Sequence, residues 1–113
     1  MRIYMGIWIP VAKRGDLEDG DVIEAVVGDH ILAVYRLRDE YFVTDGICTH
    51  QLAHLADGLV VGRIIECPKH QGRFDVRSGA PKGAPASTAL HTYPVRVEGE
   101  DICAKLDGVK RDS

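Results

Sequence analysis

Two short segments of mixed thiol and imidazole residues constrain this chain more than any other feature. The first is Cys48-Thr49-His50, and the second is Cys67-Pro68-Lys69-His70. Each segment offers one thiolate and one imidazole, and four such groups complete the coordination of a small metal site. The rest of the chain has no comparable density of metal-ligating residues. We therefore expect a fold that brings residues 48–50 and 67–70 together.

The residue types alone leave several kinds of site open. Zinc is often held by two Cys and two His, but zinc fingers usually pair Cys with Cys and His with His, whereas each segment here is mixed. A catalytic Cys–His pair would use one segment and leave the other unexplained. An iron–sulfur cluster with both Cys and His ligands uses all four residues.

The spacing closely resembles the cluster motif of Rieske [2Fe–2S] proteins. The resemblance extends to Asp57-Gly58, residues 71–75 (Gln-Gly-Arg-Phe-Asp), Ser78-Gly79 and residues 83–86 (Gly-Ala-Pro-Ala). In Rieske centres two Cys hold one iron and two His replace Cys on the other. The resemblance implies one [2Fe–2S] cluster and no catalytic residue, with these four ligands: Cys48, His50, Cys67 and His70. It also implies a proline-containing loop over the cluster, where Pro85 is the candidate and a simple turn proline is the alternative.

The pattern of the remaining sequence predicts short strands separated by polar turns, and no segment keeps a helical period. We expect strands over residues 7–11, 22–27, 31–37, 41–44, 72–76, 90–97 and 101–106, and a hairpin or bent strand over 59–66. Pro10 indicates that the first strand lies at a sheet edge. This pattern predicts an all-β Rieske iron–sulfur fold, an antiparallel sandwich or barrel-like framework with a small cluster-binding lobe, about residues 45–86, inserted in it. We expect residues 1–113 to form a single domain.

Net charge, cysteine count and the length of the apolar segments indicate the kind of compartment and partner to expect. The net charge of −3 argues against general nucleic-acid binding. Three Cys is an odd number, so the sequence does not predict a disulfide framework, and Cys103 is expected only to pack in a strand. No segment is long and apolar enough to cross a bilayer. These features predict a soluble cytoplasmic protein without a membrane partner. His54 reads as a loop residue, with a ligand role as the minor alternative.

Respiratory-chain Rieske proteins resemble the motif but carry residues that this chain lacks. They have a disulfide at the positions of Ala53 and Lys69, and hydroxyl donors at the positions of Gly72 and Phe74. Fewer hydrogen bonds stabilise the reduced, more negative cluster less well. We therefore expect a reduction potential below zero, at about −150 mV, the low end of the Rieske range.

The chain looks most like the ferredoxins of bacterial multicomponent oxygenases, many of which hydroxylate aromatic rings. This implies a monomeric one-electron carrier that takes electrons from an NAD(P)H-dependent flavin reductase and passes them to a terminal Rieske non-haem iron oxygenase. An oxygenase itself needs a catalytic domain, for which 113 residues leave no room. The alternatives are a small subunit of an assimilatory nitrite reductase, many of which lack the ligands, and a zinc-stabilised binding module.

Charge gives a weak indication of where partners dock. Residues 45–86 carry five basic and four acidic side chains, whereas the rest of the chain carries nine basic and thirteen acidic ones. A mildly basic cluster tip on an acidic body could orient the molecule against both partners. We expect transient docking at this tip, with contributions from Lys69, Arg73 and Lys82.

Overall fold

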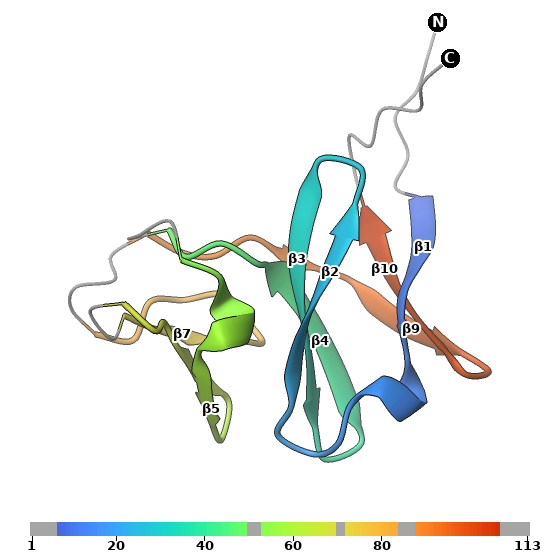
Figure 1. The fold of residues 1–113 in the computed structure, drawn as a ribbon, viewed down its shortest axis with the longest axis horizontal. Coiled ribbons are helices and arrows are strands. Elements are labelled where there is room, and N and C mark those ends of the chain that lie inside the picture. The colour runs from blue at the N-terminus through green and yellow to red at the C-terminus, as the bar shows by residue number, and fades with distance from the viewer. Residues whose placement is uncertain (1–6, 50–52, 70–71, 84–87, 107–113) are drawn as a thin grey trace, which may run out of the picture.

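The computed structural model describes residues 7–49, 53–69, 72–83 and 88–106, and their regular structure is almost entirely antiparallel strand (Figure 1). The described strands are β1 (Ile7–Lys13), β2 (Val22–Val27), β3 (His30–Leu37), β4 (Glu40–Asp45), β5 (Leu59–Val61), β6 (Ile64–Glu66), β7 (Arg73–Asp75), β8 (Thr92–Tyr93), β9 (Val95–Glu98) and β10 (Asp101–Leu106). Two single-turn 3₁₀ helices accompany them, η1 (Arg14–Asp16) and η2 (Leu55–Asp57). The predicted all-β class is confirmed.

These strands form three sheets that follow one another along the molecule (Figure 1). The outer sheet has the order β1-β10-β9, the central sheet β2-β3-β4-β8, and the lobe sheet β5-β6-β7. We call the outer and central sheets the framework, and the described residues between β4 and β8 the lobe. β1 is an edge strand, as Pro10 predicts, and its register with β10 shifts between Pro10 and Ala12.

Strand β3 lies at the centre because its side chains are buried on both faces. Leu32 and Val34 face the outer sheet, whereas Ala33 and Tyr35 face the lobe, and all four are fully buried. A strand covered on both faces needs apolar residues at consecutive positions, as residues 31–35 provide. Two cores result, one between the outer and central sheets and one between the central sheet and the lobe.

Two expectations about single segments had different outcomes. The hairpin over residues 59–66 is confirmed: β5 and β6 pair with Val61 opposite Ile64, and Gly62 in the turn has a φ of 60°. The single strand over residues 90–97 is wrong, because β8 pairs with β4 and β9 pairs with β10. Pro94 separates them; proline has no amide donor for a ladder, and the chain changes sheets at this residue.

Candidate metal centre

The first ligand segment lies on a loop whose two ends are held together by backbone contacts. Ile47 and His54 form an isolated antiparallel bridge at its base. The amide of Cys48 donates to the carbonyl of Ala53 at 2.9 Å, and the amide of Leu55 donates to Gly46 at 2.8 Å. Cys48 is therefore fixed at the beginning of a closed loop. His50 lies outside the described residues.

The second ligand segment connects β6 to β7, and the pairing of these strands positions it. Glu66 lies opposite Arg73 in the ladder, and the next amide, that of Cys67, donates to the carbonyl of Gly72 at 2.7 Å. Pro68 and Lys69 form an exposed turn beyond it. This is the same arrangement as in the first loop, with a cysteine just inside a hydrogen-bonded base. His70 lies outside the described residues.

The structure brings the two cysteine side chains together at the inner end of both loops. Cys48 and Cys67 are free thiols, 2% and 1% exposed, in the core between the lobe and the central sheet. Burial raises the pKa of the Cys67 thiol, and its hydrogen bond to Cys48 raises it further, while the amide of Lys69 acts in the opposite direction. Two soft sulfur donors in contact, with the Lys69 amide directed at the sulfur of Cys67, suit the thiolate-ligated iron of a cluster.

Close backbone approaches support both loops and explain two glycines of the motif. A Cβ atom on Gly58 would lie 2.2 Å from the carbonyl oxygen of Glu66, the residue before Cys67. Gly79 has a φ of 78°, and a Cβ there would lie 2.1 Å from the carbonyl oxygen of Leu90. Leu90 packs in the same core as both cysteines. Side chains at positions 58 and 79 would therefore push apart segments that enclose the centre.

Asp75 is a supporting residue to which the sequence analysis gave no role. Its Oδ1 accepts hydrogen bonds from the amides of Arg77 and Ser78 at 2.8 and 3.2 Å, and its Oδ2 pairs with Arg63 at 3.2 Å. Burial opposes ionisation of this carboxylate, but the two amides and Arg63 outweigh it and lower the pKa of Asp75. The Asp that precedes the Ser78-Gly79 turn was the available signal, because Asp side chains often accept amides one to three residues ahead.

His54 is not a free loop residue but a link between the lobe and the framework. Its Nδ1 pairs with Oε1 of Glu24 on β2, and both side chains are partly exposed. The hydrogen bond to Glu24 and the charge of that carboxylate raise the pKa of His54. Since His54 also closes the base of the first ligand loop, this pair ties that loop to the central sheet.

A second long-range contact holds the first loop at its other side. The hydroxyl of Thr49 donates to the carbonyl of Thr88 at 2.7 Å, across 39 positions in the sequence. Residues 84–87, including the predicted covering residue Pro85, lie outside the described residues. Neither Thr49–Thr88 nor His54–Glu24 carries a signal in the local sequence.

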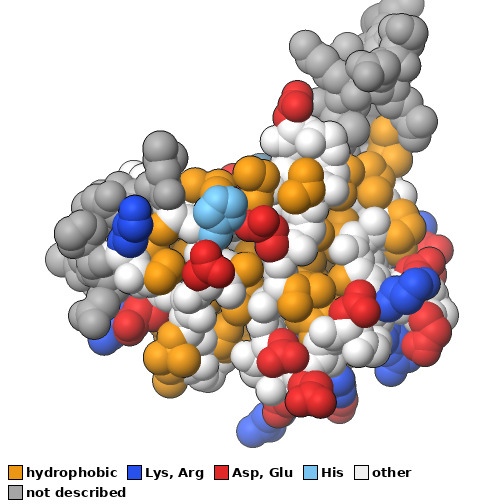
Figure 2. All heavy atoms as spheres, in the orientation of Figure 1, with side chains coloured by type: hydrophobic (Ala, Val, Ile, Leu, Met, Phe, Trp, Pro, Cys, Tyr) orange, Lys and Arg blue, Asp and Glu red, His pale blue; other side chains and the backbone are white. Residues whose placement is uncertain are grey.

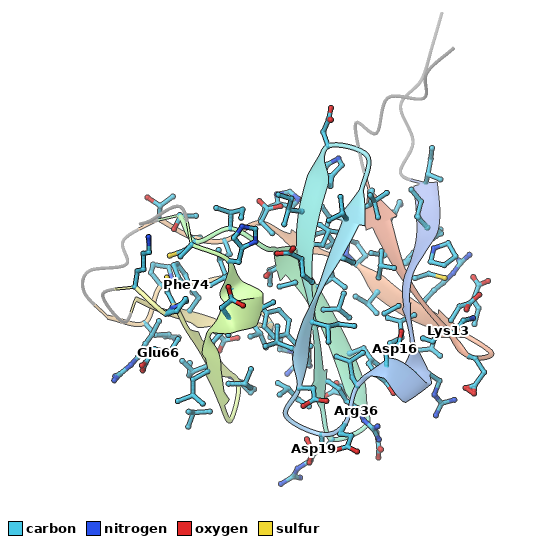
Figure 3. All side chains as sticks on the ribbon, viewed as in Figure 1. Lys13, Asp16, Asp19, Arg36, Glu66 and Phe74 are labelled. Carbon is cyan, nitrogen blue, oxygen red and sulfur yellow. The ribbon has the colours of Figure 1, made fainter. Side chains whose placement is uncertain are left out.

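The positions that lack hydroxyl donors are placed close to the sulfurs. Phe74 is fully buried in the core that contains both cysteines, and Figure 3 shows it inside the lobe. Gly72 is buried, and its carbonyl holds the Cys67 amide. Ala53 is 5% exposed, whereas Lys69 is exposed on the turn. No group of three or more potential metal ligands occurs within the described residues, from which two of the four predicted ligands are missing.

Comparison with known proteins gives a consistent result. The model of the Rieske [2Fe–2S] domain family matches residues 7–94. The ferredoxin component of a naphthalene 1,2-dioxygenase system from Pseudomonas aeruginosa is 41% identical over 88% of this chain and 95% of its own length. A solved ferredoxin from Sphingomonas yanoikuyae B1 is 38% identical with a TM-score of 0.84, covering 88% of this chain and 99% of that one.

Two further structures bear on partners and on the alternative function. A ferredoxin-containing structure described as a complex of reduced oxygenase and oxidised ferredoxin in carbazole 1,9a-dioxygenase is 34% identical, with a TM-score of 0.82, over 95% of this chain and 98% of that one. A nitrite reductase small subunit is 15% identical with a TM-score of 0.74, a likeness that shows the fold alone. None of the described helices is long and apolar enough to cross a membrane.

The buried thiol pair, the two hydrogen-bonded loops and the relatives agree on the cofactor, a Rieske-type [2Fe–2S] cluster. The chain belongs to the Rieske [2Fe–2S] domain family and, within it, to the ferredoxin components of aromatic dioxygenase systems, which transfer electrons and are not themselves catalytic.

Proposed function

We propose that this protein is a one-electron carrier between an NAD(P)H-dependent flavin reductase and a terminal Rieske non-haem iron oxygenase. Cys48 and Cys67 hold one iron of the cluster, and His50 and His70 hold the other. When bound, the cluster accepts and donates one electron, and this chain has no catalytic residue of its own. We further propose that residues 1–113 act as a single, monomeric, cytoplasmic domain, with a cluster-binding segment of about residues 45–86 inserted in the framework.

The observation that carries this proposal is the pair of buried thiols where two hydrogen-bonded loops meet. The chain supplies a rigid base for each loop, so the thiolates stay in place as the charge changes by one electron. The core around them is apolar, with Leu55, Ile65 and Phe74 fully buried. Low exposure and few hydroxyl donors destabilise added negative charge, which supports a potential at the low end of the Rieske range, about −150 mV.

The position of the loops supports docking at the tip of the lobe. Lys69 is exposed two residues after Cys67, on the turn that follows the end of β6. A partner that covers this end comes close to the cluster without disturbing the framework. Relatives named as dioxygenase ferredoxin components, and the relative described in complex with an oxygenase, support the choice of partner.

The test is reconstitution with a flavin reductase and an aromatic-ring oxygenase from a naphthalene-type system. We expect a red-brown protein with two irons and two acid-labile sulfides, which NADH and the reductase reduce and the oxygenase reoxidises with product formation. The protein alone should turn over no aromatic substrate. Stoichiometric zinc without visible absorbance would contradict the cluster, and a reduced protein that no oxygenase reoxidises would contradict the carrier role.

A further inference from the structure

Exposed apolar side chains are concentrated on one strand of the lobe. Among the described residues, four large apolar residues are exposed: Val26, Leu59, Val61 and Val97, at 65%, 58%, 59% and 41%. Leu59 and Val61 are two positions apart on β5 and therefore point to the same side of the sheet. Figure 2 shows apolar side chains at the surface near the end of the lobe where β5 lies.

The strand register shows which residues share this side. Leu59 lies opposite Glu66, which lies opposite Arg73; Val61 lies opposite Ile64, which lies opposite the buried Asp75. Four of these residues enclose a shallow hollow of about 310 Å³: Val61, Ile64, Glu66 and Arg73. We call these four residues and Leu59 the open lobe face. The reverse side of the same sheet packs on the framework through Val60, Ile65 and Phe74.

The run of consecutive apolar residues in β5 and β6 is typical of a sheet that is covered on both sides. A sheet with one solvated face normally alternates apolar and polar residues, whereas consecutive apolar residues are typical of strands covered on both faces. Residues 59–61 and 64–65 are all apolar, as in the doubly buried strand β3. Yet Leu59 and Val61 remain more than half exposed. The described part of the chain leaves this side open, so the pattern predicts a covering surface from outside it, which we assign to another molecule.

Charge defines the chemistry of that surface. Arg73 pairs with Glu66 at 3.1 Å, and their side chains are 57% and 23% exposed. Arg63, in the turn beside Val61, pairs with Asp75 at 3.2 Å, and their side chains are 60% and 7% exposed. In both pairs the guanidinium lies outward and the carboxylate lies beneath it. The outermost charged groups of these two pairs are thus guanidiniums, which complement a partner with an apolar centre and acidic residues around it.

Size and position separate a transient partner from a stable dimer. Three strands of three residues, about 4.8 Å apart with about 3.3 Å per residue, cover roughly 150 Å². A stable dimer needs about 800 Å² per partner, whereas transient electron-transfer contacts are smaller.

Glu66 immediately precedes Cys67, so Ile64 lies within about 10 Å of that thiol along β6. A contact of roughly 600 Å² centred on the tip is about 28 Å across and includes this face.

We propose that the open lobe face is a docking surface for the terminal oxygenase, with Leu59 and Val61 as its apolar centre and Arg63 and Arg73 facing acidic residues of that partner. The proposal rests on the proposed carrier function and deepens it. The oxygenase contact extends from the ligand loops down β5 and β6. We assign the face to the oxygenase because a relative that is 34% identical is described in complex with an oxygenase.

The test compares two matched double variants, Leu59→Ser/Val61→Ser on the lobe and Val26→Ser/Val97→Ser on the framework. Stopped-flow oxidation of the reduced proteins is followed against oxygenase concentration, and reduction is followed against reductase concentration. We expect the lobe variant to need about tenfold more oxygenase for half-maximal rate, as for removal of two contact side chains. Its reduction by the reductase, its cluster spectrum and its potential should stay unchanged. The framework variant should behave as the wild type in both reactions.

Each alternative outcome is distinct. Failure of the wild type to reduce the oxygenase would contradict the carrier function itself. A wild type that works, with equal rates for both double variants, would overturn the docking surface alone. Loss confined to the reductase, or shared equally between both partners, would overturn the assignment to the oxygenase. Sedimentation that shows a wild-type dimer, and a monomer for the lobe variant, would assign the face to a second copy of this chain.

Arg73→Gln should weaken the salt dependence of the oxygenase reaction, whereas Arg14→Gln on η1 should not.

Discussion

The framework and the lobe achieve order by different means. Strands β1, β2, β3, β4 and β10 of the framework have six to eight residues each, and their inward side chains form a core between two sheets. Each strand of the lobe sheet has three residues. The core of the lobe includes Ala33 and Tyr35 from the framework, together with the two cysteines proposed as ligands.

This difference shows where the metal contributes to folding. A sheet of three-residue strands has little stability of its own, and it depends on what packs against it. Backbone-bonded loops, the Asp75 carboxylate and the cluster supply what the short strands lack. The framework contains none of the proposed ligands. Loss of metal should therefore unfold the lobe selectively, because metal binding in a site assembled from two loops is linked to the folding of those loops.

The largest expected effect is that of removing a cysteine ligand. Cys67→Ser should abolish the cluster and its visible absorbance and leave the lobe amides exchanging rapidly, while the framework amides stay protected. Iron analysis and hydrogen exchange by mass spectrometry measure both parts of this result. A full cluster in the variant would mean that the ligands are wrong, and equal loss of protection in both regions would mean that lobe and framework fold as one unit.

Cys103 provides the matched control for that experiment. It is 4% exposed on β10, and burial raises the pKa of its thiol, as expected for an inert packing residue. Cys103→Ser should retain the full cluster and lower the stability of the framework by about 1 kcal/mol, because a hydroxyl replaces a buried thiol. The two serine variants thus affect opposite regions, which thermal unfolding monitored at the cluster and in the far ultraviolet separates.

A smaller effect is expected from the carboxylate that supports the lobe. Asp75→Asn removes the charge that Arg63 and two backbone amides stabilise and should lower the free energy of opening the lobe by about 2 kcal/mol at neutral pH. Because the folded state lowers the pKa of Asp75, its contribution is complete above the ordinary carboxyl pKa and is lost as the pH falls through the lowered value. The difference between wild type and variant, measured by native-state hydrogen exchange, should therefore narrow in acid.

The framework again supplies the control. Asp101 pairs with Lys13 at 3.1 Å, but both side chains are well exposed. Such a surface pair contributes about 0–1 kcal/mol, so Asp101→Asn should change neither region measurably. A pH-independent effect of Asp75→Asn would show that lost packing, and not lost charge, is responsible.

The sequence predicts the framework well because its information is local. Short apolar runs bounded by polar turns place β2, β3 and β10 within a residue of their observed ends. The failure at residues 90–97 has a long-range cause: the apolar pattern continues through Pro94, and only the pairing partners show that β8 and β9 belong to different sheets. The sequence also predicts that Cys48 and Cys67 lie close together. The structure places both thiols in one core, each just inside a loop closed by backbone hydrogen bonds.

The supports of the lobe could not be predicted in the same way. Glu24 and His54 are 30 positions apart, and Thr49 and Thr88 are 39 apart. Such contacts depend on how the lobe sits on the central sheet, which no local pattern encodes. The sequence therefore identifies which residues carry the chemistry more readily than which residues hold them in place.

A change of potential tests whether the lobe core is also the environment of the cluster. Phe74→Tyr adds a hydroxyl to a fully buried ring in the core of both cysteines. If that hydroxyl donates to a ligand thiolate or cluster sulfur, the reduced state gains more than the oxidised state. We expect the potential, measured by protein-film voltammetry, to rise by about 60 mV, a tenfold change for a one-electron couple. Val34→Thr, which adds a hydroxyl to the framework core, should leave it unchanged. A shift in both variants would mean that global destabilisation sets the potential.

The smallest expected effect concerns the junction of the two regions. Because Glu24 raises the pKa of His54, the contribution of this pair is complete below the ordinary histidine pKa and is lost as the pH rises through the raised value. Amides at the base of the first ligand loop, such as that of Leu55, should exchange a few times faster than expected from base catalysis alone above that pH. Glu24→Gln removes the acceptor charge but retains an amide oxygen, and it should abolish this extra pH dependence while framework amides on β10 remain unaffected. If the loop in Glu24→Gln keeps the wild-type pH profile, the junction is held by apolar packing alone, and the lobe is more independent of the framework than the His54–Glu24 pair indicates.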